Sequence, residues 1–541
     1  MTTTRIVAIA CAVLFSSACT LGGSGHGREA PASASGGSSH GRDAPASAGD
    51  EGSIDTQIKA WWATTGALSG DDMEGRDTGS PGYDRAAAYV ADRFERAGLR
   101  PAGDDGSWFQ RINFDEVEVT SAGTTFAVVH ADGGSRAVRF LHEISVTPTW
   151  GMAKGIDAPL VFRGYCAASD LTDVGGAVVV CFGTRRAGQP LAAAQLEATS
   201  AAGAVAMVRV DDMGFAIEPP RWPLAYARNT VIADGSPRPR TIPSLRLAAP
   251  VFTEIANASG QAGADILARG ARGETMAPFD FGARLTAQLA TRERSSTSAN
   301  VVAVLPGTDP ALANEPVLLM AHLDGYGYGT PVKGDKLYNG TLDDAAYVAT
   351  LITFADARAG QGFRRPLIFA AVTAEEKGLL GSTWLAQHPT PAAPTPVAVL
   401  NLDQLRPLYP LRILTTLALE DSSLGQTVRA VAEPMGITVR ADLEPERNLM
   451  KRTDHWPFMQ IGVPAVSFLF GFDASDAVAA AAYRDWYENR HHAPQDDTST
   501  PIDFQAQTDF HRFYFALTEA VANAPARPTW SADSPHRPGA K

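Results

Sequence analysis

Cysteine is scarce in this 541-residue chain. Of its four cysteines, Cys11 and Cys19 lie near the N-terminus, which leaves Cys166 and Cys181 for the rest of the chain. A disulfide-rich fold is therefore excluded, because at most one disulfide can form beyond the leader. An oxidising compartment would permit that disulfide, and two buried free thiols are equally compatible with the sequence.

The chain also lacks long basic runs and, after residue 20, long apolar runs. The formal net charge is −13, so no nucleic-acid partner is expected. A helix that crosses a bilayer needs about 20 continuous apolar residues, and the sequence after the leader has no such stretch. The hydrophobic content of 45% is typical of globular proteins, and the length predicts two or three compact domains.

Residues 1–19, MTTTRIVAIACAVLFSSAC, have the features of an export signal. Arg5 precedes an apolar core from Ile6 to Phe15 and a run of small residues. The final SSAC is similar to a bacterial lipoprotein processing site with Cys19 as the acylated residue, although Ser16 replaces the usual leucine. We therefore expect a periplasmic or membrane-anchored lipoprotein, held by a lipid that does not span the membrane. The alternative is ordinary cleavage nearby and a secreted protein.

Low-complexity sequence flanks the predicted folded part. Residues 20–53 are mostly Gly, Ser, Ala and Pro, and HGREAPASA at His26 recurs as HGRDAPASA at His40. A segment with so little apolar bulk cannot bury a core, so we expect a flexible linker. The composition of residues 523–541 predicts a disordered tail for the same reason.

The sequence between these segments predicts a catalytic domain with an insertion. Residues 54–117 combine helical periodicity in YDRAAAYVADRFERAGL with strand-like alternation in INFDEVEV. Residues 118–287 contain short β-branched runs between Gly and Pro turns, which predicts an inserted, mostly-β domain. Residues 288–522 alternate apolar strands such as PVLLM and RPLIFAAVT with helices. This rhythm predicts a three-layer α/β/α sandwich with a mixed sheet.

Side chains that can bind metal follow the predicted strands of the catalytic domain. In open α/β sheets the carboxyl ends of the strands form the site, so we expect these side chains at one edge. Each alone has an ordinary explanation, such as a helix cap. Together they would place many anionic oxygens at one edge, which is costly without a cation. They are His322, Asp324, Asp343, Asp344, Glu375, Glu376, Asp403, His491, His492 and Asp496.

The donor types favour particular metals. Mixed carboxylate and imidazole donors suit zinc, or else cobalt or manganese, better than calcium. The number of donors exceeds what one catalytic zinc needs, because such a zinc usually takes three protein ligands. A pair of metals about 3.5–4 Å apart that share one carboxylate would use them all.

Six motifs resemble those of the co-catalytic di-zinc exopeptidases, a family that includes bacterial and vacuolar aminopeptidases and glutamate carboxypeptidase. In chain order they are HLD, NGTLDDAAY, AEEKGLLGS, NLD, TDHWPFMQIGVPA and HHAPQDD, between Ser296 and Thr500. The earlier stretch MEGRDTGSPGYDR is also similar. The insertion resembles the protease-associated domain of many members through GAVVVCFG and AAGAVAMVRV. That likeness implies that the insertion covers the cleft or limits substrate size. Because the insertion has no candidate ligand residues of its own, a passive addition to the fold is the alternative.

The resemblance implies two zinc ions per chain, with Asp343 bridging them. One zinc would be held by His322, Asp343 and Asp403. The other would be held by Asp343, Glu376 and His492. His491 replaces the tyrosine that usually precedes the last ligand, and it is the alternative to His492.

The resemblance also assigns residues beside the ligands. Glu375 would act as general base and take a proton from the attacking water. Asp324 would accept the second ring N–H of His322. Asp454 and His455 match the family's S-D-H motif and would supply supporting hydrogen bonds.

Two aromatic features concern the substrate cavity. Tyr347 stands where the family's loop usually ends in a small glycine, which predicts a reshaped cavity. The loop GYGYG, residues 325–329, is a candidate lining of the cavity mouth.

The expected function is removal of N-terminal residues from peptides by an exported zinc aminopeptidase. Aminopeptidase is favoured over carboxypeptidase because no arginine cluster clearly awaits a substrate carboxylate, although Arg406 and Arg452 lie close to motif residues. One alternative is a single-zinc enzyme similar to glutaminyl-peptide cyclase, against which both His322 and Asp343 argue. The other is a non-catalytic binding protein on a peptidase fold, which would be expected to have lost ligands.

Overall fold

The computed structural model describes residues 48–541, except residues 187, 214–221, 239–240, 404, 540 and 541. The expected export signal, Cys19 and the linker up to residue 47 lie outside the described residues. Residues Glu51–Lys541 form one compact unit, and helix α1 spans Ala48–Leu68. Among the described helices, none combines the length and the apolar character that crossing a membrane requires.

The central sheet of the compact unit is mixed. Its strand order is β19-β18-β20-β17-β13-β16-β12-β2-β9, and the short β1 also pairs with β12. Strands β16, β13, β17 and β20 run parallel to one another, whereas β12 is antiparallel to both β16 and β2. The strands are β1 (Arg100–Pro101), β2 (Phe109–Val119), β9 (Arg228–Ile232), β12 (Thr291–Leu305), β13 (Val317–His322), β16 (Leu367–Val372), β17 (Ala398–Asn401), β18 (Ile413–Leu417), β19 (Thr438–Ala441) and β20 (Ala465–Gly471).

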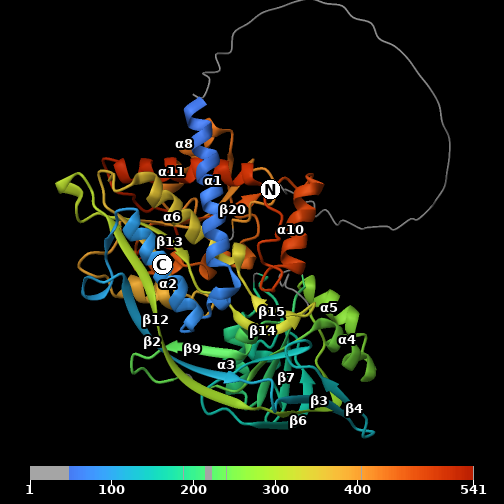
Figure 1. Cartoon of the computed structure of the whole chain (residues 1–541). Coiled ribbons are helices and arrows are strands. Elements are labelled where there is room, and N and C mark those ends of the chain that lie inside the picture. Colours follow the sequence, from blue (N-terminus) through green and yellow to red (C-terminus); the bar gives the residue numbers. More distant parts are fainter. Residues whose placement is uncertain (1–47, 187, 214–221, 239–240, 404, 540–541) are drawn as a thin grey trace, which may run out of the picture. The chain divides into compact units, whose positions relative to one another are not determined.

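Successive residues of a strand point to opposite faces of the sheet. Apolar side chains therefore lie on both faces of this sheet, and helices cover each face. In β12, Val301 and Ala303 belong to one apolar core and Val302 belongs to another. The first core is closed by helices α1, α2 (Pro81–Arg96), α6 (Ala346–Arg358), α8 (Leu424–Ala432), α10 (Ala477–Asn489) and α11 (Phe504–Asn523). The second is closed by α7 (Leu380–Gln387) and α9 (His455–Gln460). The expected three-layer α/β/α sandwich with a mixed sheet is confirmed (Figure 1).

Within this compact unit, the insertion forms a mostly-β domain with a sheet of its own, as expected. Its strand order is β4-β3-β11-β6-β7-β8-β10-β5, and it has its own apolar core. Cys166 and Cys181 form a disulfide, which resolves the alternative that the sequence left open. The strands are β3 (Thr125–His130), β4 (Ser135–Val138), β5 (Ile144–Thr147), β6 (Gly155–Phe162), β7 (Val178–Gly183), β8 (Ala206–Asp211), β10 (Ser244–Leu247) and β11 (Phe279–Gln288), with helices α3 (Ala192–Ala201), α4 (Ala249–Ala258) and α5 (Gly263–Ala271).

One segment of the insertion joins the catalytic sheet. Strand β9 pairs antiparallel with β2 and forms the edge of the central sheet (Figure 1). Arg228, its first residue, places its guanidinium 2.5 Å from the carboxylate of Asp77, and both side chains are largely buried. A buried ion pair of this kind fixes the position of the segment, because separating it would leave an uncompensated charge. The turn just before β9 is thereby fixed against the catalytic domain.

The C-terminal segment differs from the expected disordered tail. Trp530 donates its indole N–H to the carbonyl of Gly462 at 2.8 Å, and the Ser531 amide donates to the carbonyl of Asp421 at 2.8 Å. Trp530 also packs against the core under α7 and α9. The composition of the segment did not predict this contact, because one tryptophan anchors a segment that is otherwise polar.

Candidate metal centre

The strands of the central sheet deliver the predicted donors to one edge. His322 ends β13, the pair Glu375–Glu376 follows β16, and Asp403 follows β17. Because β13 runs parallel to both β16 and β17, these three segments leave the sheet on the same side. A short helical turn, Thr341–Ala345, brings Asp343 to this edge, and His492 comes from the loop after α10.

Asp343 lies at the centre of the donor group. Its Oδ1 is 3.3 Å from His322 Nε2 and its Oδ2 is 3.4 Å from His492 Nε2. Glu376 Oε2 lies 4.0 Å from the same nitrogen of His492. One donor atom each from His322, Asp343 and Asp403 lie within 4.8 Å of one another. The two sides of one carboxylate therefore face two different groups of donors.

These separations fit a shared metal better than direct hydrogen bonds. Donor atoms that share a tetrahedral zinc at about 2.0–2.1 Å lie about 3.3–3.4 Å apart. A charge-assisted N–H···O bond is shorter, at about 2.7–2.9 Å. Within the described part of the chain, Asp343 Oδ2 and Glu376 Oε1 are buried and accept no hydrogen bond. One donor group is His322, Asp343 and Asp403, and another is Asp343, His491 and His492. Both groups fit a metal in chemistry and spacing, whereas Glu376 belongs to neither and lies 4.0 Å from His492. The role of the predicted residues as ligands stays a prediction.

Electrostatics support the same interpretation. Burial raises the pKa of Glu376 to about 7, and the neighbouring charge of Asp343 adds to this effect. Burial likewise raises the pKa values of Asp344 and Glu375 well above their usual range. For Asp343, burial alone would raise the pKa, but the imidazoles of His322 and His492 beside its two oxygens outweigh this effect and hold the pKa well below its usual range. A bound cation would stabilise the ionised forms of these crowded carboxylates.

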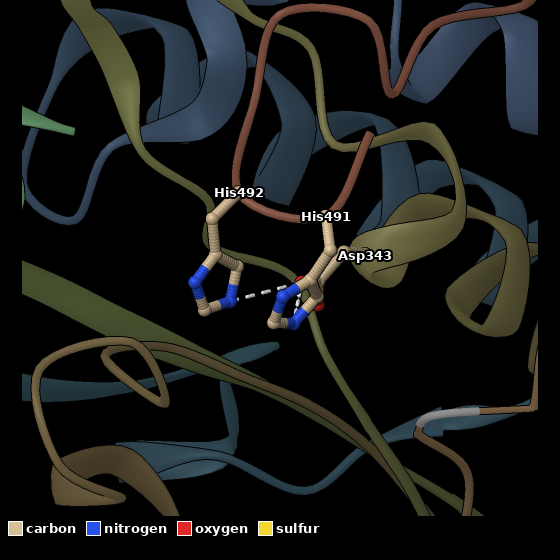
Figure 2. A group of neighbouring side chains, drawn as sticks. All are labelled: Asp343, His491 and His492. Atoms are coloured by element: carbon tan, nitrogen blue, oxygen red, sulfur yellow. Dashed lines mark ion pairs between the residues drawn. The ribbon is translucent and has the colours of Figure 1, made fainter. Parts of the chain in front are cut away.

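Of the two adjacent histidines, His492 is better placed to be a ligand. Figure 2 shows both imidazoles beside Asp343, with dashed lines to its carboxylate. His491 Nε2 is 3.9 Å from Asp343 Oδ2, compared with 3.4 Å for His492. The two rings stack with centroids 3.6 Å apart, so His491 supports the ring of His492.

Asp324 lies beside His322 as expected, but it contacts the imidazole through a different oxygen atom. Its backbone carbonyl, 3.0 Å from His322 Nδ1, makes the contact that was predicted for its carboxylate, which lies 3.8 Å away. The carboxylate instead accepts the backbone N–H groups of Glu375 at 3.0 Å and Glu376 at 3.3 Å, and the Thr78 hydroxyl at 3.2 Å. Asp324 therefore positions the adjacent glutamates while its own carbonyl orients the imidazole.

Asp496 and Arg76 hold the turn that carries Asp343. The Asp496 carboxylate accepts the backbone N–H of Leu342 at 2.9 Å and that of Asp343 at 3.0 Å. Arg76, fully buried, donates to the carbonyls of Asn339 at 2.7 Å and Gly340 at 2.8 Å. Arg76 was not among the predicted site residues, although it lies within the MEGRDTG stretch that resembled the family.

Asp454 and His455 lie behind the donors and are buried. The Ser382 hydroxyl donates to Asp454 at 2.5 Å, and burial raises the pKa of Asp454 to about 7. Thr453 Oγ1 lies 2.6 Å from His455 Nδ1, and burial lowers the pKa of His455 to about 3. Neither residue belongs to the groups of donors that could share a metal among the described residues, and their supporting role stays a prediction.

Two tyrosines complete the site, and one of them comes from the insertion. Tyr326, in the GYGYG loop, donates to Glu376 at 2.5 Å. Tyr226, in the turn before β9, places its hydroxyl 2.6 Å from His492 Nδ1 and its ring against that of Tyr326. The loop was a candidate from the sequence. Tyr226 was not, because no motif marks a single residue whose position depends on how the insertion folds back.

Tyr347 does not reshape the cavity as expected. Its side chain is fully buried in the core of the sandwich, and its hydroxyl accepts the backbone N–H of Arg406 at 2.6 Å. The larger ring is accommodated beneath the site because α6 turns this position toward the sheet. The substitution for the usual glycine therefore acts on core packing.

A cavity of about 710 Å³ opens over the donors and lies between the insertion and the catalytic domain. Asp343, Glu375, Glu376, His491 and His492 line one part of it. An arginine cluster, which the sequence did not make apparent, lines another part. Its members are Arg185, Arg209, Arg246, Arg447 and Arg452. The sequence-based reason for preferring an aminopeptidase over a carboxypeptidase is therefore wrong, because distant segments assemble the cluster.

Comparisons with known proteins agree with this architecture. The chain is similar in fold to an aminopeptidase from Aneurinibacillus, with a TM-score of 0.57 and 17% identity over 87% of this chain and 95% of that one. It is similar in fold to a zinc aminopeptidase from Bacillus subtilis, with a TM-score of 0.56 and 18% identity over 86% of this chain and 95% of that one. At these identities the likeness concerns the fold alone.

Sequence comparison addresses the family directly. The chain is 27% identical to leupeptin-inactivating enzyme 1 of Streptomyces exfoliatus over 187 residues, which are 34% of this chain and 39% of that relative. Residues 300–517 match the profile of peptidase family M28. This range contains the predicted donors from His322 to His492. The likeness to peptidase family M28 therefore lies in residues 300–517, the part of the chain that carries the predicted donors.

Proposed function

We propose that the protein is an exported aminopeptidase that hydrolyses N-terminal residues from peptides with two zinc ions. The observation that carries the proposal is the position of Asp343, which faces His322 on one side and His492 on the other. A second donor set would have no purpose in a single-zinc enzyme. Export rests on the sequence of residues 1–19, and attachment to the membrane would occur only through a lipid on Cys19.

The residues present divide the chemistry among them. Zinc held by His322, Asp343 and Asp403, and by Asp343, Glu376 and His492, would supply Lewis acidity toward water and the scissile carbonyl. Glu375 lines the cavity beside these donors. Its carboxylate takes a proton from the attacking water and delivers it to the leaving amine. Asp324 fixes the backbone of Glu375 for this transfer.

The acidic part of the cavity also suits an N-terminal substrate. A peptide's α-ammonium group is attracted to the carboxylate of Glu375, which lines the cavity and is not among the proposed zinc ligands. A covalently closed or acylated N-terminus lacks this attraction. The donors therefore place the scissile bond close to the ammonium group, as removal of one terminal residue requires.

A screen of aminoacyl chromogenic substrates, with and without a chelator, tests the proposal. We expect turnover that the chelator abolishes and added zinc restores, and metal analysis should find about two zinc ions per chain. The same peptides with an acetylated N-terminus provide the control and should not be cleaved. Turnover that is indifferent to the chelator, or cyclisation of an N-terminal glutamine without hydrolysis, would contradict the proposal.

Tyr226→Phe should weaken metal binding at the site of His492. When Nε2 of His492 coordinates a metal, Nδ1 carries the proton and the Tyr226 oxygen, 2.6 Å away, accepts it. Loss of such a partner typically lowers metal affinity about 10–100-fold. Titration of the apoprotein with zinc, followed by activity, measures the effect, and excess zinc should restore most turnover. Tyr328→Phe, at a side chain 48% exposed, is the matched control. An unchanged zinc requirement in Tyr226→Phe would refute this role.

A further inference from the structure

The cavity over the metal centre is also lined by cations from both domains. Arg185, Arg209 and Arg246 come from the insertion, and Arg447, Lys451 and Arg452 come from the segment between β19 and α9. These cations line the same cavity as the carboxylates of the metal centre, together with Asp211 and Asp212.

Some of these cations already have a carboxylate partner. Arg209 and Arg246 both contact the carboxylate of Asp211, each at 2.6 Å. Arg447 lies 3.3 Å from Glu444, and it donates to the Tyr483 hydroxyl at 2.6 Å. Arg209 and Arg246 share one carboxylate, so these ion pairs reduce the positive charge of the three arginines without cancelling it.

Arg185 and Arg452 are different. Within the described ranges, neither guanidinium has a carboxylate within 4.0 Å. Arg185 donates to the backbone carbonyl of Arg447 at 2.6 Å. This hydrogen bond holds the guanidinium of Arg185 against the catalytic domain but does not neutralise its charge. Burial, together with the charges of Arg452 and Arg209, lowers the pKa of Arg185 to about 10. A partly buried guanidinium crowded by like charges is stabilised by an anion that binds between them.

We propose that Arg185 and Arg452 form an anion subsite that binds a substrate carboxylate on the leaving-group side of the scissile bond. The inference rests on the proposed function and names its substrate class, which is short peptides with a negative charge beyond the first residue. The α-ammonium of such a peptide lies beside Glu375, and its carboxylate lies between Arg185 and Arg452, which line the same cavity. A guanidinium is suited to this contact because its planar donors match a carboxylate in a bidentate arrangement.

The carboxylate has two sources, and matched peptides separate them. All share the N-terminal residue that the aminoacyl screen selects, here written X. The pair X-Ala-Ala and X-Ala-Ala-amide tests the C-terminal carboxylate. The pair X-Glu-Ala-amide and X-Gln-Ala-amide tests an acidic side chain. We expect kcat/KM to be about tenfold or more higher for the charged member of at least one pair, since hydrogen bonds to charged groups are the stronger class.

Variants assign the preference to the subsite. In Arg185→Gln and in Arg452→Gln the ratio of kcat/KM between charged and neutral members should fall toward one, and added salt should reduce the ratio of the native protein. Arg512→Gln, at an exposed position on α11 outside the cavity, is the control and should keep the native ratio. Because ratios are compared within one variant, a general loss of folded protein does not affect the result.

The outcomes distinguish this inference from the proposed function. If the native protein cleaves both members of each pair equally well, the subsite is refuted and the aminopeptidase remains. A preference that survives in both arginine variants also refutes it. If no peptide and no aminoacyl substrate is cleaved in the presence of zinc, the proposed function itself fails.

Discussion

Glu375→Gln is expected to lower kcat by about 10²–10⁴-fold, the usual contribution of a general base, while the protein keeps its zinc. Glutamine preserves the size of the side chain but cannot accept a proton from water at neutral pH. The backbone N–H of residue 375 would still donate to Asp324, so the neighbouring Glu376 should stay in place. Turnover of an aminoacyl chromogenic substrate and zinc content per chain, measured on the same sample, check both parts.

A matched control shows whether the effect is specific to the cavity. Glu433→Gln changes an exposed glutamate at the end of α8, outside the cavity lining, and should keep native turnover. A Glu375→Gln protein that retains more than about a tenth of native turnover would refute the general-base role, since even the weaker cases contribute about 10²-fold. Loss of zinc in this variant would instead assign Glu375 to the metal ligands.

The fold was predictable because its signal is local. Strands such as β13 and β16 are buried along their whole length and read as continuous apolar runs. Their parallel pairing places every residue that follows them at one edge, so the convergence of His322, Glu376 and Asp403 follows from the strand rhythm alone. The resemblance then assigned the roles that spacing could not.

Contacts made across the chain were not predictable. Tyr226 and Arg185 belong to the insertion, and their positions depend on how β9 and the loop after β7 return to the catalytic domain. No periodicity or motif marks such residues. Asp324 illustrates a subtler limit, because the sequence gives the residue but not which of its oxygens faces His322. The same reasoning explains why the arginine cluster was missed.

Asp343→Asn should remove both metals and nearly all activity. The carboxylate presents one oxygen to His322 and the other to His492, and an amide replaces one of these oxygens with an N–H₂ group that cannot coordinate. We expect zinc content to fall from about two per chain toward zero and kcat to fall about 10³-fold or more. Single replacements on either side provide the comparison: His322→Ala and His492→Ala should each keep about one zinc, because the opposite donor set is left intact. Circular dichroism should show native secondary structure in all three, since the sandwich core does not depend on these donors. Asp343 is not a carboxylate shared by two metal sites if Asp343→Asn retains two zinc ions. The two sites are not separable if His322→Ala and His492→Ala each lose both zinc ions as completely as Asp343→Asn does. Either result would contradict the proposed arrangement.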